Sequence, residues 1–217
     1  MRLLAKAMRF SIKFSLFRLL TFRKNKELVQ LIKRIQSESG FMMWPDEMSM
    51  LYTTAFALKN KKGDFAEVGV STGGSAKLIS EAKGGKNFHL FDTFEGLPEP
   101  GEQDKHLHRG QYTCSLPAVK EYLKSYTAIH YYPGLFPQTS KPVENKTFSF
   151  VHLDVDLYQS TLDAIRFFYP RLETGGMLIS HDYSTVPGVR KAFDEFFIET
   201  PEVVVELPTS QCLVVKI

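Results

Sequence analysis

Two apolar segments of the sequence each end in a group of polar side chains. One ends in Asp154 and Asp156, and the other ends in His181 and Asp182. If these segments are neighbouring strands of an open parallel sheet, their carboxyl ends bring Asp154, His181 and Asp182 close to one another. Carboxylate oxygens with one imidazole suit Mg²⁺ or Mn²⁺. We therefore predict a divalent-metal site here, although the acids could instead cap helices, with Asp156 before Ser160 as the best candidate.

A glycine-rich turn follows an earlier apolar segment. The sequence Glu67-Val-Gly69-Val-Ser-Thr-Gly73-Gly-Ser has the order of strand, turn and helix that points backbone N–H groups at a ligand. An acid at Glu67 is awkward beside a pyrophosphate, whereas Asp92 ends the next strand and can accept both hydroxyls of a ribose. Together these residues indicate a nucleoside ligand without phosphates, such as S-adenosylmethionine. The alternatives are a plain tight turn and an Asp92 that caps the turn after it.

The segment Thr93–Ser115 has little helix or strand pattern. Loops of this length in a compact domain are usually functional, so we expect it to close over a substrate. His106 and His108 lie within it, and either could act as a general base. Taken alone, each of them fits a solvated loop residue as well.

A sheet is needed to bring these residues together, and the apolar pattern predicts one. Short apolar runs predict strands at 65–70, 87–92, 128–132, 148–154, 177–180, 203–207 and 211–216. Helical spacing predicts helices at 27–36, 45–58, 74–82, 116–125, 160–172 and 188–197. Alternating strands and helices form a parallel sheet with helices on both faces, and ligands bind beyond the carboxyl ends of its strands. Only Pro208–Ser210 separates the last two strands, so these two must pair antiparallel.

Length and composition fit one globular domain. The chain has 217 residues, of which 43% are hydrophobic, and its 18 Phe and 9 Tyr are too many for a disordered chain. The net charge of +3 is uneven, because residues 1–26 hold eight bases and no acid, which leaves −5 for residues 27–217. A mildly acidic body argues against a nucleic-acid partner. Cys114 and Cys212 lack zinc-ligand spacing, so we expect a reducing, cytoplasmic location.

The first 22 residues mix basic and apolar side chains. Arg2, Lys6, Arg9 and Lys13 recur at spacings of three and four, which places them on one stripe of a helix. This pattern is typical of a helix that lies on an anionic membrane surface, here the inner face of the membrane, and its charges are too frequent for a membrane span. Packing on the body, contact between copies in a homo-oligomer, and organellar targeting are the alternatives. We divide the chain into this basic amphipathic arm (1–26), a cap of two helices (27–63) and a ligand-binding domain (64–217).

Six blocks of the sequence occur in a familiar order. They are Glu67–Ser75, Phe91–Pro98, Tyr132–Pro137, His152–Tyr158, Ser180–Tyr183 and Pro187–Ala192. They resemble the macrocin O-methyltransferase (TylF/MycF) family of class I S-adenosylmethionine-dependent methyltransferases, and the resemblance covers about residues 40–217. It implies an α/β, Rossmann-like sheet of seven strands, mostly parallel with an antiparallel C-terminal hairpin, with helices on both faces and an N-terminal helical extension. It also implies magnesium-dependent methylation of a sugar hydroxyl.

The resemblance also assigns residues of the site by position. Asp154 and Asp182 take the metal positions with His181 beside them, and Asp154 and His181 are the catalytic candidates. The cofactor positions are Glu67, Gly69, Ser71, Thr72, Gly73, Ser75, Asp92, Thr93, Phe94, Gly134 and Phe136. Well-known members have two aspartates where this chain has His181-Asp182, so the identity of the metal and the need for it stay open.

The reaction implied is an in-line transfer of a methyl group from a sulfonium to a hydroxyl of a small molecule or glycan. A divalent ion would lower the pKa of the hydroxyl, and Asp154 could take its proton, with His181, His106 or His108 as alternatives. Two other functions remain, a metal-dependent hydrolase and a non-catalytic membrane-surface module with a nucleotide-binding fold. The hydrolase leaves the glycine turn and Asp92 without a purpose, and binding of S-adenosylmethionine would exclude it.

Overall fold

The computed structural model of the chain describes residues 25–39 and 43–217, together with Ile12, Ser15 and Leu19. The basic arm predicted for residues 1–26 therefore lies almost entirely outside the described residues. Within the described part, no helix has the length and apolar character needed to cross a membrane.

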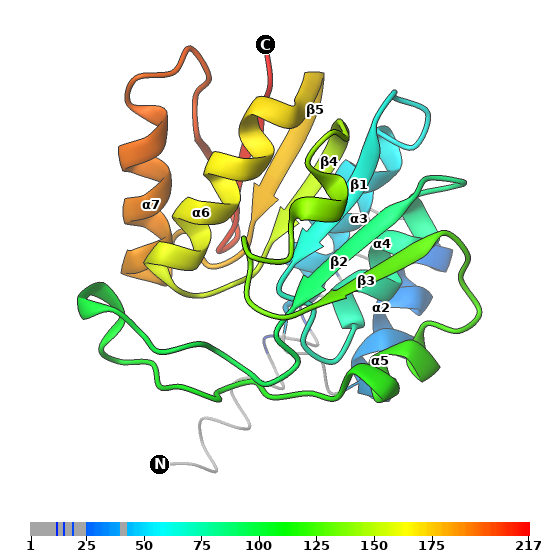
Figure 1. Cartoon of the computed structure of the whole chain (residues 1–217). Helices are drawn as coiled ribbons and strands as arrows, with labels where there is room; N and C mark the ends of the chain where they lie inside the picture. Colours follow the sequence, from blue (N-terminus) through cyan, green and yellow to red (C-terminus); the bar gives the residue numbers. More distant parts are fainter. Residues whose placement is uncertain (1–11, 13–14, 16–18, 20–24, 40–42) are drawn as a thin grey trace.

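The described residues form one seven-stranded sheet in the order β3-β2-β1-β4-β5-β7-β6 (Figure 1). The strands are β1 (Asp64–Val68), β2 (Phe88–Asp92), β3 (Ile129–Pro133), β4 (Phe148–Leu153), β5 (Leu172–Ser180), β6 (Val205–Glu206) and β7 (Cys212–Val215). Strands β1 to β5 run parallel, whereas β7 pairs antiparallel with both β5 and β6. The predicted fold class is confirmed, including the antiparallel final hairpin and the adjacent positions of β4 and β5.

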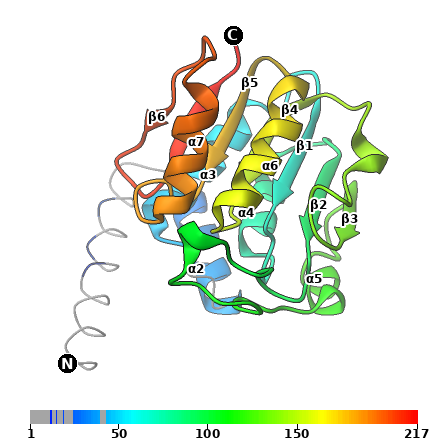
Figure 2. The ribbon, with the colours of Figure 1, turned by 60° about the vertical axis from the view of Figure 1, so that its left-hand side comes forward.

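Side chains alternate between the two faces of the sheet and build a core on each. In β1, Phe65 packs into one core, while Ala66 and Val68 pack into the other. On the first face lie α2 (Lys26–Ser39), α3 (Pro45–Ala57), α4 (Gly74–Ala82) and α5 (Leu116–Tyr122), and on the second lie α6 (Tyr158–Phe168) and α7 (Pro187–Phe197). Figure 2 shows α6 and α7 in front of the sheet and α2, α3 and α4 behind it. Helices on both faces explain why the parallel strands are almost continuously apolar.

The first two described helices, α2 and α3, belong to the core on the first face of the sheet. Leu28, Ile32 and Ile35 recur at helical spacing along α2 and are buried. They share a core with α3, α4 and Phe65 of β1. Truncating a fully buried isoleucine to alanine costs about 2–5 kcal/mol. The described helices of the segment predicted as a helical cap (27–63), α2 and α3, therefore lie on one face of the sheet.

Several element boundaries differ from those predicted. The helix expected at 160–172 spans Tyr158–Phe168, and a 3₁₀ turn follows it because Pro170 has no amide hydrogen to continue the helix. Strand β5 begins at Leu172, where it already pairs with β4, rather than at Met177. Strand β6 is shorter than predicted and consists of two exposed residues.

Candidate active site

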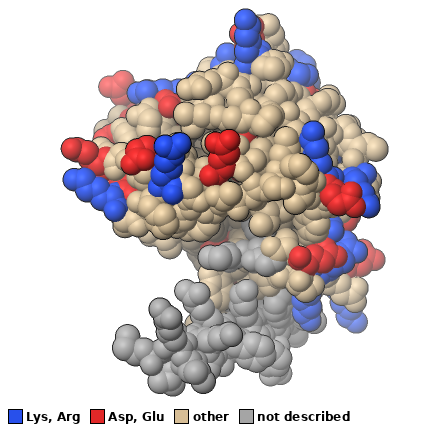
Figure 3. All heavy atoms as spheres, turned by 60° about the horizontal axis from the view of Figure 1, so that its bottom comes forward, with Lys and Arg blue, Asp and Glu red and all other residues tan. Residues whose placement is uncertain are grey.

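The carboxyl ends of the parallel strands border a cavity of about 520 Å³, within the usual range for a small-molecule site. Figure 3 shows this end of the molecule, where most charged side chains lie toward the rim and most of the surface is uncharged. Four residues predicted for the site do not line the cavity, namely Glu67, Gly73, Ser75 and Phe94. Ten predicted residues do line it: Gly69, Ser71, Thr72, Asp92, Thr93, Gly134, Phe136, Asp154, His181 and Asp182.

The turn after β1 presses its backbone against the end of β4. Gly69 has a φ of 88°, and a Cβ built on it would lie 1.9 Å from the carbonyl oxygen of Asp154, so no larger residue fits. The chain continues through Ser71, at a φ of 46°, to Gly73, the left-handed N-cap of α4. The predicted ligand-facing turn thus brings the backbone of residues 69–72 to the cavity wall.

Asp92, at the end of β2, holds this turn from the other side. Its Oδ2 accepts the amides of Val70 (2.6 Å) and Ser71 (2.9 Å), and its Oδ1 accepts the amide of Phe94 (2.7 Å). A carboxylate has about four acceptor positions, so Asp92 has room for about one further hydrogen bond. The turn-capping alternative is therefore realised in the structure, and the same side chain still lines the cavity.

Glu67 lies beneath the glycine turn rather than in the cavity. It is fully buried, its Oε1 lies 2.8 Å from Nδ1 of His152 on β4, and Ser75 in the first turn of α4 lies beside it. Its Oε2 has no hydrogen-bond partner among the described residues. Burial raises the pKa of the Glu67 carboxyl. In this geometry Glu67 lies beneath the turn and does not itself line the cavity.

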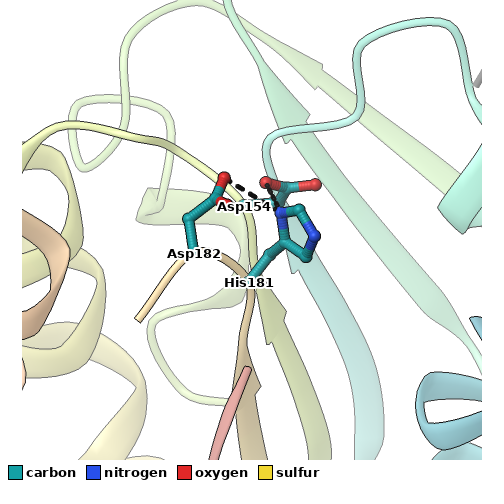
Figure 4. A group of neighbouring side chains, drawn as sticks. All are labelled: Asp154, His181 and Asp182. Atoms are coloured by element: carbon teal, nitrogen blue, oxygen red, sulfur yellow. Dashed lines mark hydrogen bonds and ion pairs between the residues drawn. The ribbon is translucent and has the colours of Figure 1, made fainter. Parts of the chain in front are cut away.

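Asp154, His181 and Asp182 meet at the carboxyl ends of β4 and β5 (Figure 4). Nδ1 of His181 lies 3.0 Å from Oδ2 of Asp182 and 3.3 Å from Oδ1 of Asp154. One ligand atom from each of the three residues lies within 4.8 Å of the others. Burial alone would lower the pKa of His181. The charge of Asp154 and hydrogen bonds to Asp154, Asp182 and Glu47 nevertheless hold this pKa well above its usual value. Two carboxylates and one imidazole at this spacing fit a divalent metal ion.

Asp156 belongs to the same acidic group. Burial, followed by the charges of Asp154 and Asp182, raises the pKa of Asp156 to about 8. The prediction that Asp156 could cap the following helix is wrong, because the amide of Tyr158 is bound by Oδ2 of Asp104 at 3.0 Å. Asp156 instead has a φ of 58° and lines the cavity. A cation bound beside these carboxylates would relieve their mutual repulsion.

The segment 93–115 forms one wall of the cavity. Within it, the amides of Leu97 and Gly110 donate to the carbonyls of Gln111 and Leu97. The buried Asp104 fastens it to the start of α6. The two histidines of this wall, at 106 and 108, are exposed and do not line the cavity, so neither is placed to act as the base.

Several cavity residues are not predicted from the sequence, among them Trp44, Glu47 and Tyr112. Trp44 and Glu47 lie at the start of α3, where the local pattern indicates only the beginning of a helix.

Residues with a strained backbone are concentrated at the cavity, and each costs about 1–3 kcal/mol. Of the six described non-glycine residues with positive φ, four line the cavity: Ser71, Tyr112, Asp156 and Asp182.

The charge of the cavity lining is negative. None of the described residues that line it is Lys or Arg, so the field favours a cationic ligand. The carboxyl groups of the lining are those of Glu47, Asp92, Asp154, Asp156 and Asp182.

Comparison with known proteins gives matches to methyltransferases. The sequence model of the macrocin-O-methyltransferase (TylF) family matches residues 48–204. A Streptomyces olivaceus protein named 8-demethyl-8-(2,3-dimethoxy-alpha-L-rhamnosyl)-tetracenomycin-C 4'-O-methyltransferase is 32% identical over 139 residues, which cover 56% of this chain and 53% of that protein. The chain thus spans about half the length of this curated relative.

Solved structures share the fold. The O-methyltransferase NovP superposes with a TM-score of 0.72 at 23% identity, and the match covers 81% of each chain. An O-methyltransferase from Bacillus cereus, solved in complex with SAH, has a TM-score of 0.63 at 13% identity, covering 93% of this chain and 97% of that one.

Proposed function

The chain belongs to the macrocin O-methyltransferase (TylF) family, and we propose that it transfers a methyl group from S-adenosylmethionine to a sugar hydroxyl. One observation carries the proposal: the glycine turn, Asp92 and the group of Asp154, His181 and Asp182 all open into one cavity. The relative from Streptomyces olivaceus is named for methylation of a compound that carries a rhamnosyl group, which supports a sugar as the acceptor. That sugar could belong to a glycan, a glycolipid or a glycosylated natural product.

The part of the cavity beside β1 and β2 suits the cofactor. S-adenosylmethionine supplies a methyl group that is already activated by a positively charged sulfur. The backbone of residues 69–72 would lie along its methionine part, and Asp92 would accept one ribose hydroxyl at its remaining acceptor position. Gly134 and Phe136, which follow β3, would flank the adenine. The acidic lining favours the positive charge of this ligand.

The part of the cavity beside β4 and β5 suits the acceptor. Asp154 is the candidate to accept the proton that the hydroxyl loses, because both ring nitrogens of His181 are in contact with carboxylates. Trp44, whose amide binds Glu47, offers an aromatic surface to a sugar ring, as does Tyr112 beside the acidic group. The cavity walls would align the two reactants and limit access of water.

The metal part of the proposal rests on Asp154, His181 and Asp182, which would hold a divalent ion. Such an ion would act as a Lewis acid and lower the pKa of the sugar hydroxyl. The donor atoms and their separation support this assignment.

The arm of residues 1–22 would place the enzyme at a membrane surface. This location would suit a lipid-linked or surface polysaccharide as acceptor, because such a substrate lies at a membrane.

Two measurements test this function. Calorimetry of the full chain with S-adenosylmethionine should show binding, and absence of binding would contradict the proposal in favour of the hydrolase. Transfer of labelled methyl groups from S-adenosylmethionine to a panel of cell-envelope glycans, glycolipids and rhamnosylated small molecules then identifies the acceptor. We expect EDTA to stop the transfer and added Mg²⁺ or Mn²⁺ to restore it.

A further inference from the structure

Both ring nitrogens of His181 are in contact with carboxylates. Nδ1 faces Asp154 and Asp182, and Nε2 lies 3.2 Å from Oε2 of Glu47 on α3. The His181 side chain is 16% exposed, so it has little space to adopt another rotamer. The contact with Glu47 joins residues that are 134 positions apart in the sequence.

Glu47 is itself held between the start of α3 and the connection from β6 to β7. Only 3% of the residue is exposed. Its Oε2 also accepts the amide of Trp44 (2.7 Å), and its Oε1 accepts the hydroxyl (2.5 Å) and the amide (3.3 Å) of Ser210. A carboxylate fixed from three directions can orient an imidazole but has little freedom to move toward a substrate.

This arrangement is the one that metal-binding histidines usually have. A histidine that binds a metal through one nitrogen donates its other ring N–H to a carboxylate, which fixes the tautomer and the direction of the lone pair. We propose that Glu47 is a positioning residue that holds Nδ1 of His181 toward Asp154 and Asp182, where a bound metal ion would take the place of the Nδ1 proton, and that the resulting nitrogen–oxygen site prefers Mn²⁺ or Co²⁺ to Mg²⁺. The preference follows from the ligands, because imidazole suits transition metals, whereas Mg²⁺ favours oxygen donors and water. The inference rests on the metal site of the proposed function, but it does not depend on the acceptor.

Calorimetric titration of the full chain with Mn²⁺, Co²⁺ and Mg²⁺ tests the site without any methyl transfer. We expect the wild type to bind Mn²⁺ or Co²⁺ at least about 10-fold more tightly than Mg²⁺, and H181D to lose this preference. E47A should weaken Mn²⁺ binding by about 10-fold, and E47Q should weaken it less, because its amide oxygen still accepts a hydrogen bond. D64A is the matched control, since Asp64 contacts another buried histidine, His89, at 2.9 Å but does not line the cavity, and the affinity for Mn²⁺ should stay unchanged.

A double variant separates orientation of the imidazole from general support of α3. In the H181D background no imidazole remains to be oriented, so adding E47A should change Mn²⁺ affinity by less than about two-fold. Electron paramagnetic resonance of bound Mn²⁺ should detect a coupled nitrogen in the wild type, and this coupling should weaken in E47A.

An equal loss of Mn²⁺ affinity on adding E47A to the wild type and to H181D would assign Glu47 a purely structural role and overturn the inference. Unchanged Mn²⁺ affinity in E47A would overturn it as well. Calorimetry with S-adenosylmethionine on the same samples distinguishes the remaining cases. A wild type that binds the cofactor but no divalent ion would overturn this inference and the metal part of the proposed function together. A wild type that binds metal with the expected preference but no cofactor would support the inference and contradict only the methyltransferase proposal.

Discussion

Aspartate and histidine come together at both ends of the sheet, in two different settings. At the amino ends of the strands, Asp64 contacts His89 Nε2 at 2.9 Å and accepts hydrogen bonds from Lys146 (3.1 Å) and Asn87 (3.2 Å). The other ring nitrogen of His89 lies 2.9 Å from the hydroxyl of Tyr132. Burial alone would raise the pKa of Asp64, but its hydrogen bonds with His89, Lys146 and Asn87 lower this pKa.

At the carboxyl ends, acids outnumber bases. Asp154, Asp156 and Asp182 surround a single His181, and the pKa of Asp156 is raised to about 8 by burial and by its acidic neighbours. These residues line the cavity, whereas Asp64 and His89 do not. An aspartate–histidine contact is therefore not by itself a site: a balanced network stabilises the fold, whereas an excess of one charge beside a cavity is arranged for a ligand.

The largest effect is a loss of activity that distinguishes the carboxyl ends of the strands from their amino ends. Asp154→Asn should lower kcat for methyl transfer by about 10²–10⁴-fold at saturating metal, because the hydroxyl proton loses its acceptor. Asp64→Asn at the opposite end should leave kcat within about two-fold, while it lowers the free energy of unfolding by about 1–3 kcal/mol through a lost charged partner. Steady-state kinetics and denaturant unfolding measure the two quantities. Full turnover in the Asp154 variant would remove the proposed distinction.

The glycine turn provides the next contrast. Gly69→Ala would place a Cβ 1.9 Å from the carbonyl oxygen of Asp154, so it should weaken S-adenosylmethionine binding at least about 10-fold and lower stability by about 2–3 kcal/mol. Gly85→Ala is the control, because a Cβ at Gly85 meets nothing within 4 Å. It should leave both quantities nearly unchanged. Equal cofactor affinity in the two variants would show that the turn does not form the cofactor site.

A smaller effect is expected from pH at the amino ends of the strands. Burial lowers the pKa of His89, although Asp64 opposes this shift. The folded protein therefore binds this proton less readily than the unfolded chain, so the contribution of His89 to stability is complete above about pH 6.5 and is lost as the pH falls below it. Unfolding at pH 7.5 and 5.5 should show a larger loss of stability on acidification in the wild type than in His89→Gln. Identical losses would mean that His89 does not contribute.

The smallest effect on the cofactor site is expected from the arm (residues 1–26), almost all of which lies outside the described residues. Deletion of residues 1–22 should leave the affinity for S-adenosylmethionine within about two-fold, because every described residue that lines the cavity lies at position 43 or beyond. It should lower binding to vesicles that contain anionic lipid, because eight bases and no acid lie within residues 1–26. Vesicle co-sedimentation tests this prediction, and unchanged binding would favour packing or targeting as the role of the arm.

Much of the architecture could be predicted because it depends on short-range pattern. Alternation of Phe65, Ala66 and Val68 between two cores follows from the two-residue period of a strand. The short link between the last two strands required an antiparallel pair, and β6 and β7 have it. The end of α6 was harder to predict, because Pro170 shows only roughly where the helix stops. The start of β5 was also harder to predict, because it depends on pairing with β4.

Side-chain roles within the site were harder to predict. Glu67 was expected beside a ligand, but register places it next to His152, where both side chains are buried. Asp156 suited a helix cap by position alone, yet Asp104 from a distant loop supplies that cap. Local helix and strand propensities do not fix these hydrogen-bond partners. The partners depend on which groups the tertiary structure brings within hydrogen-bonding distance.

The local sequence was therefore sufficient to place Asp92, Asp154, His181 and Asp182 at the carboxyl ends of strands, because strand period and parallel topology require it. Packing supplied the rest. The contact between Glu47 and His181, which are 134 positions apart, and the burial that raises the pKa of Asp156 both depend on how α3, β4 and β5 pack together. Desolvation and hydrogen bonding act over a few ångströms of space rather than along the chain, so only the folded molecule gives these groups their chemistry.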